Sequence, residues 1–148
     1  MLMFSNGTAL VVLRGFKSNN PRTWAIPGGN IDTDDVDLFE TAEREVKEEL
    51  GRLPVNLTMV DEIVTERGSD DKKYTVFLVE VPVEAKAIYY PILNKEHTDF
   101  KWFPYAELFR IFNLHPVLKE LLKNHRTDVE RAFGLQPSPE KKLSKSQG

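Results

Sequence analysis

The chain carries the stretch Arg44-Glu45-Val46-Lys47-Glu48-Glu49-Leu50-Gly51, and before it the stretch Pro27-Gly28-Gly29-Asn30. Its acidic residues Glu45, Glu48 and Glu49 are spaced i, i+3 and i+4, so on an α-helix they project from one face. Carboxylates placed so close repel one another. A solvated acidic face is the alternative, but we favour a site for a hard divalent cation such as Mg²⁺, which takes oxygen ligands from carboxylates and from substrate phosphates.

The residues around these acids predict where the helix begins and ends. An apolar stripe at three- and four-residue spacing anchors its other side and consists of Leu38, Phe39, Ala42, Val46 and Leu50. Asp37, three residues before Glu40, is typical of a capping residue, and Gly51 is typical of a C-terminal stop. We therefore expect a helix over Leu38–Leu50, with Glu49 on the exposed face.

With this pattern the chain resembles the Nudix hydrolase family, whose motif ends in Arg-Glu-apolar-x-Glu-Glu-x-Gly-apolar. Residues 44–51 match that half without a gap, and Gly29 matches the glycine that opens the motif. Two further segments look like the family's approach to the motif and its last strand, namely 24–29 and 96–104.

The match departs from the motif at two places. The interval after the first glycine is one residue longer, so the loop acid falls on Asp35 or on Val36, and we place the extra residue in loop 30–36. Arg52 stands where the motif has an apolar residue, and Leu53 could take over that packing.

The resemblance implies a fold and an activity. Nudix proteins are of the α/β class, an α/β/α sandwich with a mixed sheet between helices. They hydrolyse a nucleoside diphosphate linked to another group X, by attack of water on phosphorus, and this needs neutralised phosphate charge and a positioned water. We therefore expect a Nudix pyrophosphohydrolase that uses Mg²⁺, with Mn²⁺ able to substitute.

The resemblance also assigns roles to residues. The metal would be held by the side chains of Glu45, Glu48 and Glu49 and by a backbone carbonyl of Gly28 or Gly29. Arg44 would orient one of the carboxylates through paired hydrogen bonds. In some relatives a glutamate before such a late strand adds a metal ligand or acts as the base, and Glu96 matches that position. Glu45 is the other candidate base, and a plain loop charge is the alternative for Glu96.

Other residues are candidates for substrate contact. The turn at Gly28-Gly29 lets the backbone approach a ligand closely. Arg14 could reach a phosphate or be a solvated strand end, Trp24 could stack a base or pack in the core, and Tyr74 could line the pocket or pack on the sheet. The three histidines show no metal-ligand spacing, so we expect His97, His115 and His125 to be structural or exposed.

Hydrophobic patterning predicts the remaining elements. The expected strands are Met1–Phe4, paired in a hairpin with Ala9–Leu13, and then Leu57–Glu66, Lys72–Val83 and Asp99–Phe103. Tyr105–Phe112 starts helical, and Pro116 can begin a further helix. Residues 136–148 are rich in Lys, Ser and Pro and are expected to form a disordered tail after a single domain over 1–135.

Composition adds a few exclusions. The chain has 148 residues, no cysteine and a net charge of -3, so disulfides, thiolate metal sites and a general basic footprint for nucleic acid are all excluded. We find no membrane-spanning run or signal peptide and expect a cytoplasmic location, with a nuclear one as the alternative.

The substrate is not readable from the sequence. The marks that distinguish ADP-ribose and diadenosine polyphosphate hydrolases are missing, and Tyr74 lies beyond the spacing expected for the latter, which favours a small nucleotide such as a nucleoside triphosphate. Capped RNA is a minor candidate, and the oligomeric state stays open. The alternative function is a catalytically silent Nudix-fold sensor or interaction module that binds a nucleotide or RNA.

Overall fold

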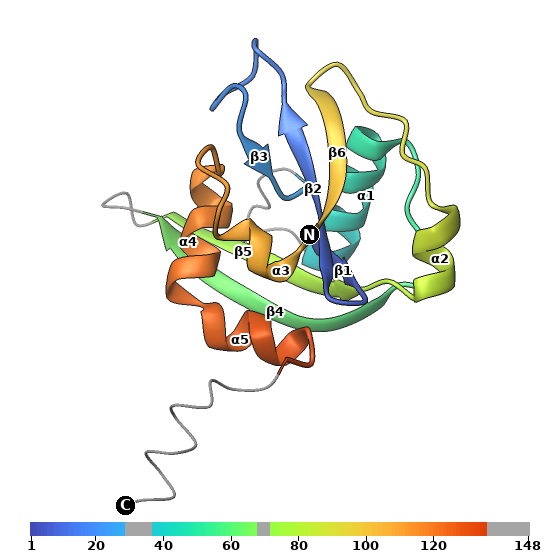
Figure 1. Ribbon diagram of the computed structural model, residues 1–148. Coiled ribbons are helices and arrows are strands. Elements are labelled where there is room, and N and C mark those ends of the chain that lie inside the picture. The colour runs from blue at the N-terminus through green and yellow to red at the C-terminus, as the bar shows by residue number, and fades with distance from the viewer. Residues whose placement is uncertain (29–36, 68–71, 136–148) are drawn as a thin grey trace, which may run out of the picture.

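The protein is described by a computed structural model that covers residues 1–28, 37–67 and 72–135 (Figure 1). Six strands form one mixed sheet: β1 (Leu2–Ser5), β2 (Thr8–Arg14), β3 (Trp24–Ala25), β4 (Thr58–Arg67), β5 (Lys72–Glu80) and β6 (His97–Pro104). The strand order is β3-β2-β1-β5-β4, and β6 lies off this path and pairs with β2 along its length, from Thr8 to Arg14. Because β1 and β5 run parallel while the other pairs are antiparallel, the sheet is mixed, as expected.

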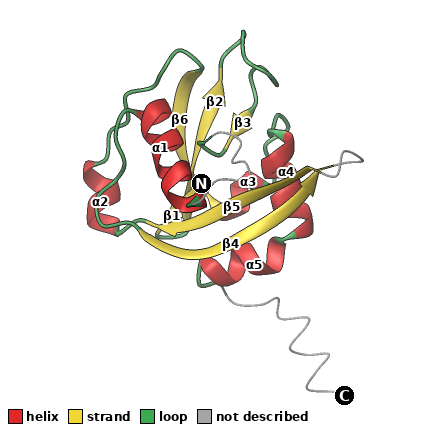
Figure 2. Ribbon diagram, turned by 180° about the vertical axis from the view of Figure 1, so that it is seen from behind, coloured by secondary structure: helices red, strands yellow, loops and turns green. Residues whose placement is uncertain are grey.

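Helices cover both faces of this sheet (Figure 2). One face carries α1 (Leu38–Leu50), and the other carries α4 (Pro116–Asn124) and α5 (Arg126–Ala132). Two short helices, α2 (Val83–Ile88) and α3 (Tyr105–Leu108), flank β6 along the chain. Every helix within the described ranges is too short or too polar to span a bilayer.

The central strands are apolar on both faces because each face has its own core. Along β1, Leu2 packs toward α4 and α5, whereas Met3 packs toward α1. On β5, Leu78 likewise packs toward α4 and α5 and Phe77 packs toward α1, because neighbouring side chains of a strand point to opposite faces. This arrangement confirms the predicted α/β/α sandwich.

The helix that carries the acids is confirmed over Leu38–Leu50. The side chain of Asp37 accepts a hydrogen bond from the backbone N–H of Glu40 at 3.0 Å, and the N–H of Gly51 donates to the carbonyl of Lys47. Gly51 has φ +76°, and a Cβ there would lie 2.9 Å from Cβ of Ile92, so only glycine fits this end of the helix.

Other boundaries differ from expectation. The strand predicted over Lys72–Val83 ends at Glu80, because Pro82 lacks an N–H for the ladder and serves as the N-cap of α2. The helix expected over Tyr105–Phe112 stops at Leu108. Sequence patterning missed β3, α2 and α5, all of which are short. The predicted tail, 136–148, lies outside the described residues.

Candidate active site

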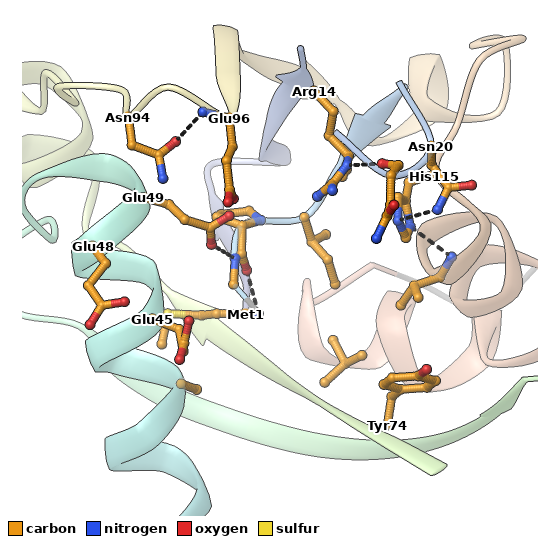
Figure 3. A pocket seen from close by; sticks show the side chains of 18 of the residues that line it. Met1, Arg14, Asn20, Glu45, Glu48, Glu49, Tyr74, Asn94, Glu96 and His115 are labelled. Atoms are coloured by element: carbon orange, nitrogen blue, oxygen red, sulfur yellow. Dashed lines mark hydrogen bonds between the residues drawn. The ribbon is translucent and has the colours of Figure 1, made fainter. Parts of the chain in front are cut away.

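A cavity of about 370 Å³ opens where α1, the start of β6, the β2–β3 connection and the start of α4 come together (Figure 3). Its acidic side is formed by Glu45, Glu48 and Glu49 of α1 and by Glu96, which directly precedes β6. The structure thus brings all four predicted carboxylates into one cavity, although Glu96 is almost fifty residues further along the chain.

Glu49 is buried, which corrects the expectation that it lies on the exposed face. Only 7% of it is accessible, since it stands where α1 faces the sheet and the loop before β6. One carboxylate oxygen accepts a hydrogen bond from the backbone N–H of Gly28, and the other lies 3.2 Å from Nε2 of His97. Burial raises the pKa of Glu49 to about 7, against the opposing effect of the Gly28 hydrogen bond.

His97 is buried, in keeping with the structural alternative, and it also faces Glu49, which the sequence did not predict. Its Nδ1 lies 3.0 Å from Oδ1 of Asn94, an oxygen that also accepts the N–H of Glu96, so Nδ1 carries the proton. The Nε2 lone pair is therefore free to face Glu49. Burial lowers the pKa of His97, and the imidazole is neutral at neutral pH. An orienting hydrogen bond of this kind is typical of histidines that hold metals.

The donor set fits a divalent cation. Glu49, Glu96 and His97 each offer one ligand atom, and these atoms lie within 4.8 Å of one another. On the same helix, Glu48 is adjacent to Glu49 in sequence and Glu45 lies about one turn before it, and both line the same cavity. A buried carboxylate whose pKa is raised by lack of solvent is the kind of group that a cation would compensate.

Arg44 and Gly28 stand beside the acids. Nη2 of Arg44 lies 4.0 Å from Oε1 of Glu45, but the side chain is two-thirds exposed and does not line the cavity. Gly28 has φ +122°, which L side chains rarely adopt, and this conformation aims its N–H at Glu49. Gly29 and the loop 30–36, with Asp35 and Val36, lie outside the described residues.

The wall opposite the acids carries neutral and cationic groups (Figure 3). Arg14 lines the cavity at the end of β2, and its Nε donates to the carbonyl of Asn19 at 2.7 Å. Asn20 and His115, distant in sequence, lie 3.4 Å apart between Nδ2 and Nε2, and Nδ1 of His115 accepts the N–H of Val117.

Two aromatic candidates take different places. Tyr74 lines the cavity from β5. Trp24 is not among the lining residues; it packs edge-on against Phe103 at 5.2 Å, in keeping with the core alternative. Sequence reasoning missed Asn94, Asn20 and His115 as parts of the site. The sequence also did not place His97 at the site, and for this residue the one available signal was its position directly after Glu96.

Comparisons with known proteins identify the family and the fold. The family model described as the NUDIX domain matches residues 1–125. A Nudix hydrolase from M. smegmatis, RenU, aligns with a TM-score of 0.70 at 21% identity, covering 93% of this chain and 85% of that one. No curated protein sequence matches.

Two further solved structures share the fold. The MutT protein of Methanosarcina mazei Go1 aligns with a TM-score of 0.63 at 24% identity, covering 88% of this chain and 90% of that one. A C. elegans Ap4A hydrolase, solved as a binary complex, aligns with a TM-score of 0.59 at 18% identity, covering 90% and 92%.

The sandwich and the acid-bearing helix define a Nudix-fold hydrolase. The chain belongs to the NUDIX domain family, within the class of pyrophosphohydrolases, and enzymes of this family generally use a divalent metal.

Proposed function

We propose that the protein hydrolyses the pyrophosphate bond of a nucleoside diphosphate linked to a second group, by attack of water on phosphorus. The observation that carries this proposal is the division of the cavity. Four carboxylates gather on one side, while Arg14, Asn20 and His115 stand on the other. The carboxylate side suits a metal-bound phosphate, and the opposite side suits the polar groups of a nucleoside.

A divalent cation held by these residues would neutralise phosphate charge and lower the pKa of a bound water. One oxygen of Glu49 accepts the backbone N–H of Gly28, which fixes the carboxylate in place, and the other faces the Nε2 lone pair of His97, so a cation between them would be shared by both groups. Glu45 and Glu96 are the candidates for the base, because each lines the cavity and neither is buried. The guanidinium of Arg14 would hold a phosphate of the substrate.

Mg²⁺ and Mn²⁺ are the proposed ions. The carboxylates suit both, and the imidazole of His97 is a ligand that Mn²⁺ accepts more readily than Mg²⁺ does. We therefore expect Mn²⁺ to support turnover at least as well as Mg²⁺.

A turnover screen tests the proposal. The purified protein is assayed with nucleoside triphosphates, ADP-ribose, dinucleoside polyphosphates and capped RNA, each with Mg²⁺ or Mn²⁺. Glu48→Gln removes a cavity carboxylate, and Glu43→Gln on the same helix is the matched control outside the cavity. We expect metal-dependent release of phosphate or nucleotide that Glu48→Gln suppresses and Glu43→Gln retains. Binding of a nucleotide with no turnover by the wild type would instead indicate a silent sensor.

A further inference from the structure

A second hollow, of about 600 Å³, lies beside the cavity and shares Arg14, Asn19 and Glu96 with it. It is built from the β2–β3 connection and the segment that leads into β6, and its remaining walls include Phe16, Lys17, Lys95 and Thr98. A group bound at Glu96 therefore has room to continue from one hollow into the next. The proposed function uses only the first.

The second hollow is cationic. Arg14, Lys17 and Lys95 line it against a single acid, Glu96, in a chain whose net charge is -3. A local excess of positive charge beside a phosphate site favours further phosphates.

An exposed aromatic ring stands at the same place. Phe16 is 77% accessible, and the guanidinium of Arg22 lies over its ring at 4.8 Å from the centroid. Nη1 of Arg22 also donates to Oγ1 of Thr98 at 3.0 Å, so the ring is tied to the wall of the hollow. An exposed ring held in place is a surface on which a nucleobase can stack, with the arginine adding a cation–π contact.

The loop that carries these groups is preformed. The N–H of Gly15 donates to the carbonyl of Glu96 at 2.8 Å, and Oγ of Ser18 donates to the carbonyl of Gly15 at 2.8 Å. Oγ1 of Thr23 donates to the carbonyl of Asn20 at 2.7 Å. A ligand would therefore meet a surface that needs little ordering on binding.

We propose that this second hollow binds the second nucleotide of a dinucleoside polyphosphate, whose phosphate chain crosses from the first cavity at Arg14 and Glu96. The inference rests on the proposed function and names its second group X. It departs from the sequence-based expectation of a nucleoside triphosphate, because the second hollow adds cations and an exposed ring beyond the first cavity. A nucleoside triphosphate would occupy the first cavity alone, and Phe16 with Lys17 would act only on the longer substrate.

The test compares diadenosine tetraphosphate with ATP as substrates of the wild type, Phe16→Ala and Lys17→Gln. Loss of the stacking ring should lower kcat/KM for the dinucleotide at least about fivefold. Turnover of ATP should stay within about twofold, since Phe16 lies outside the first cavity. Phe112→Ala is the control for truncating an exposed ring, as Phe112 is 97% accessible and lines neither hollow. Lys123→Gln on α4 controls for the lost charge.

A binding measurement separates this inference from the proposed function. Calorimetry with non-hydrolysable analogues of the two substrates reports affinity whether or not the wild type turns them over. An absence of turnover would contradict the proposed function and leave this inference testable by binding. Weaker binding of only the dinucleotide analogue by Phe16→Ala supports the second hollow. Equal effects on both analogues, or no effect on the dinucleotide, overturns it.

Discussion

Replacing Glu49 by glutamine tests the site and the buried carboxylate together. Glutamine has nearly the same shape, and its amide oxygen can still accept the N–H of Gly28. The variant should fold, but it lacks an ionisable ligand at the centre of the acidic side. Loss of one metal ligand or base commonly costs about 10²–10⁴ in rate, and we expect turnover to fall in that range.

The stability of the same variant should depend on pH in a defined sense. The pKa of Glu49 rises from 4.5 in the unfolded chain to about 7 in the metal-free fold, which is worth about 3 kcal/mol. Because the unfolded chain loses its proton first, the free energy of unfolding of the wild type loses this amount as pH rises from about 4.5 to about 7. Glutamine cannot ionise, so the variant gains about 3 kcal/mol relative to the wild type over that window.

Urea unfolding in EDTA, followed by tryptophan fluorescence at about pH 4.5 and about pH 8, measures this difference. Taking the difference between the two proteins removes the titration of groups that do not interact with Glu49. The Met1 amino group, whose pKa burial lowers to about 5, interacts with the Glu49 charge and so contributes to the difference. Glu43→Gln serves as the control on the same helix. Turnover within a few-fold of wild type would refute the catalytic reasoning, and a pH-independent difference in stability would refute the burial argument.

Three further outcomes are expected. EDTA should abolish turnover and Mg²⁺ or Mn²⁺ should restore it, measured as product release; full activity without metal would contradict the assigned chemistry. Glu96→Gln should lower kcat sharply with little change in KM if Glu96 is a ligand or the base, whereas a plain loop charge leaves both within a few-fold in steady-state kinetics. Gly51→Ala should lower the free energy of unfolding by about 1–3 kcal/mol in urea, because the added Cβ meets Ile92 and the φ of this residue is positive. Gly134→Ala, at φ +74° with open space around it, is the control and should lose less. Equal losses would show that the Ile92 contact costs nothing.

The sequence by itself determined the acid-bearing helix and the class of fold. Capping by Asp37, the stop at Gly51 and the apolar stripe are local signals, and each operates within a few residues of the helix it bounds. The central strands were also readable, because burial on both faces demands continuous apolar runs. The short elements β3, α2 and α5 were missed, since their positions depend on contacts made elsewhere in the chain.

Only the tertiary structure decided how the acids differ from one another. Spacing made Glu45, Glu48 and Glu49 equivalent, but packing of α1 against the loop before β6 buried Glu49 and left the other two at the cavity wall. The partnership of His97 with Asn94 and Glu49 and the approach of Asn20 to His115 join segments far apart in sequence. Helical periodicity specifies which residues share a face, whereas burial and pKa depend on what the rest of the chain places against that face.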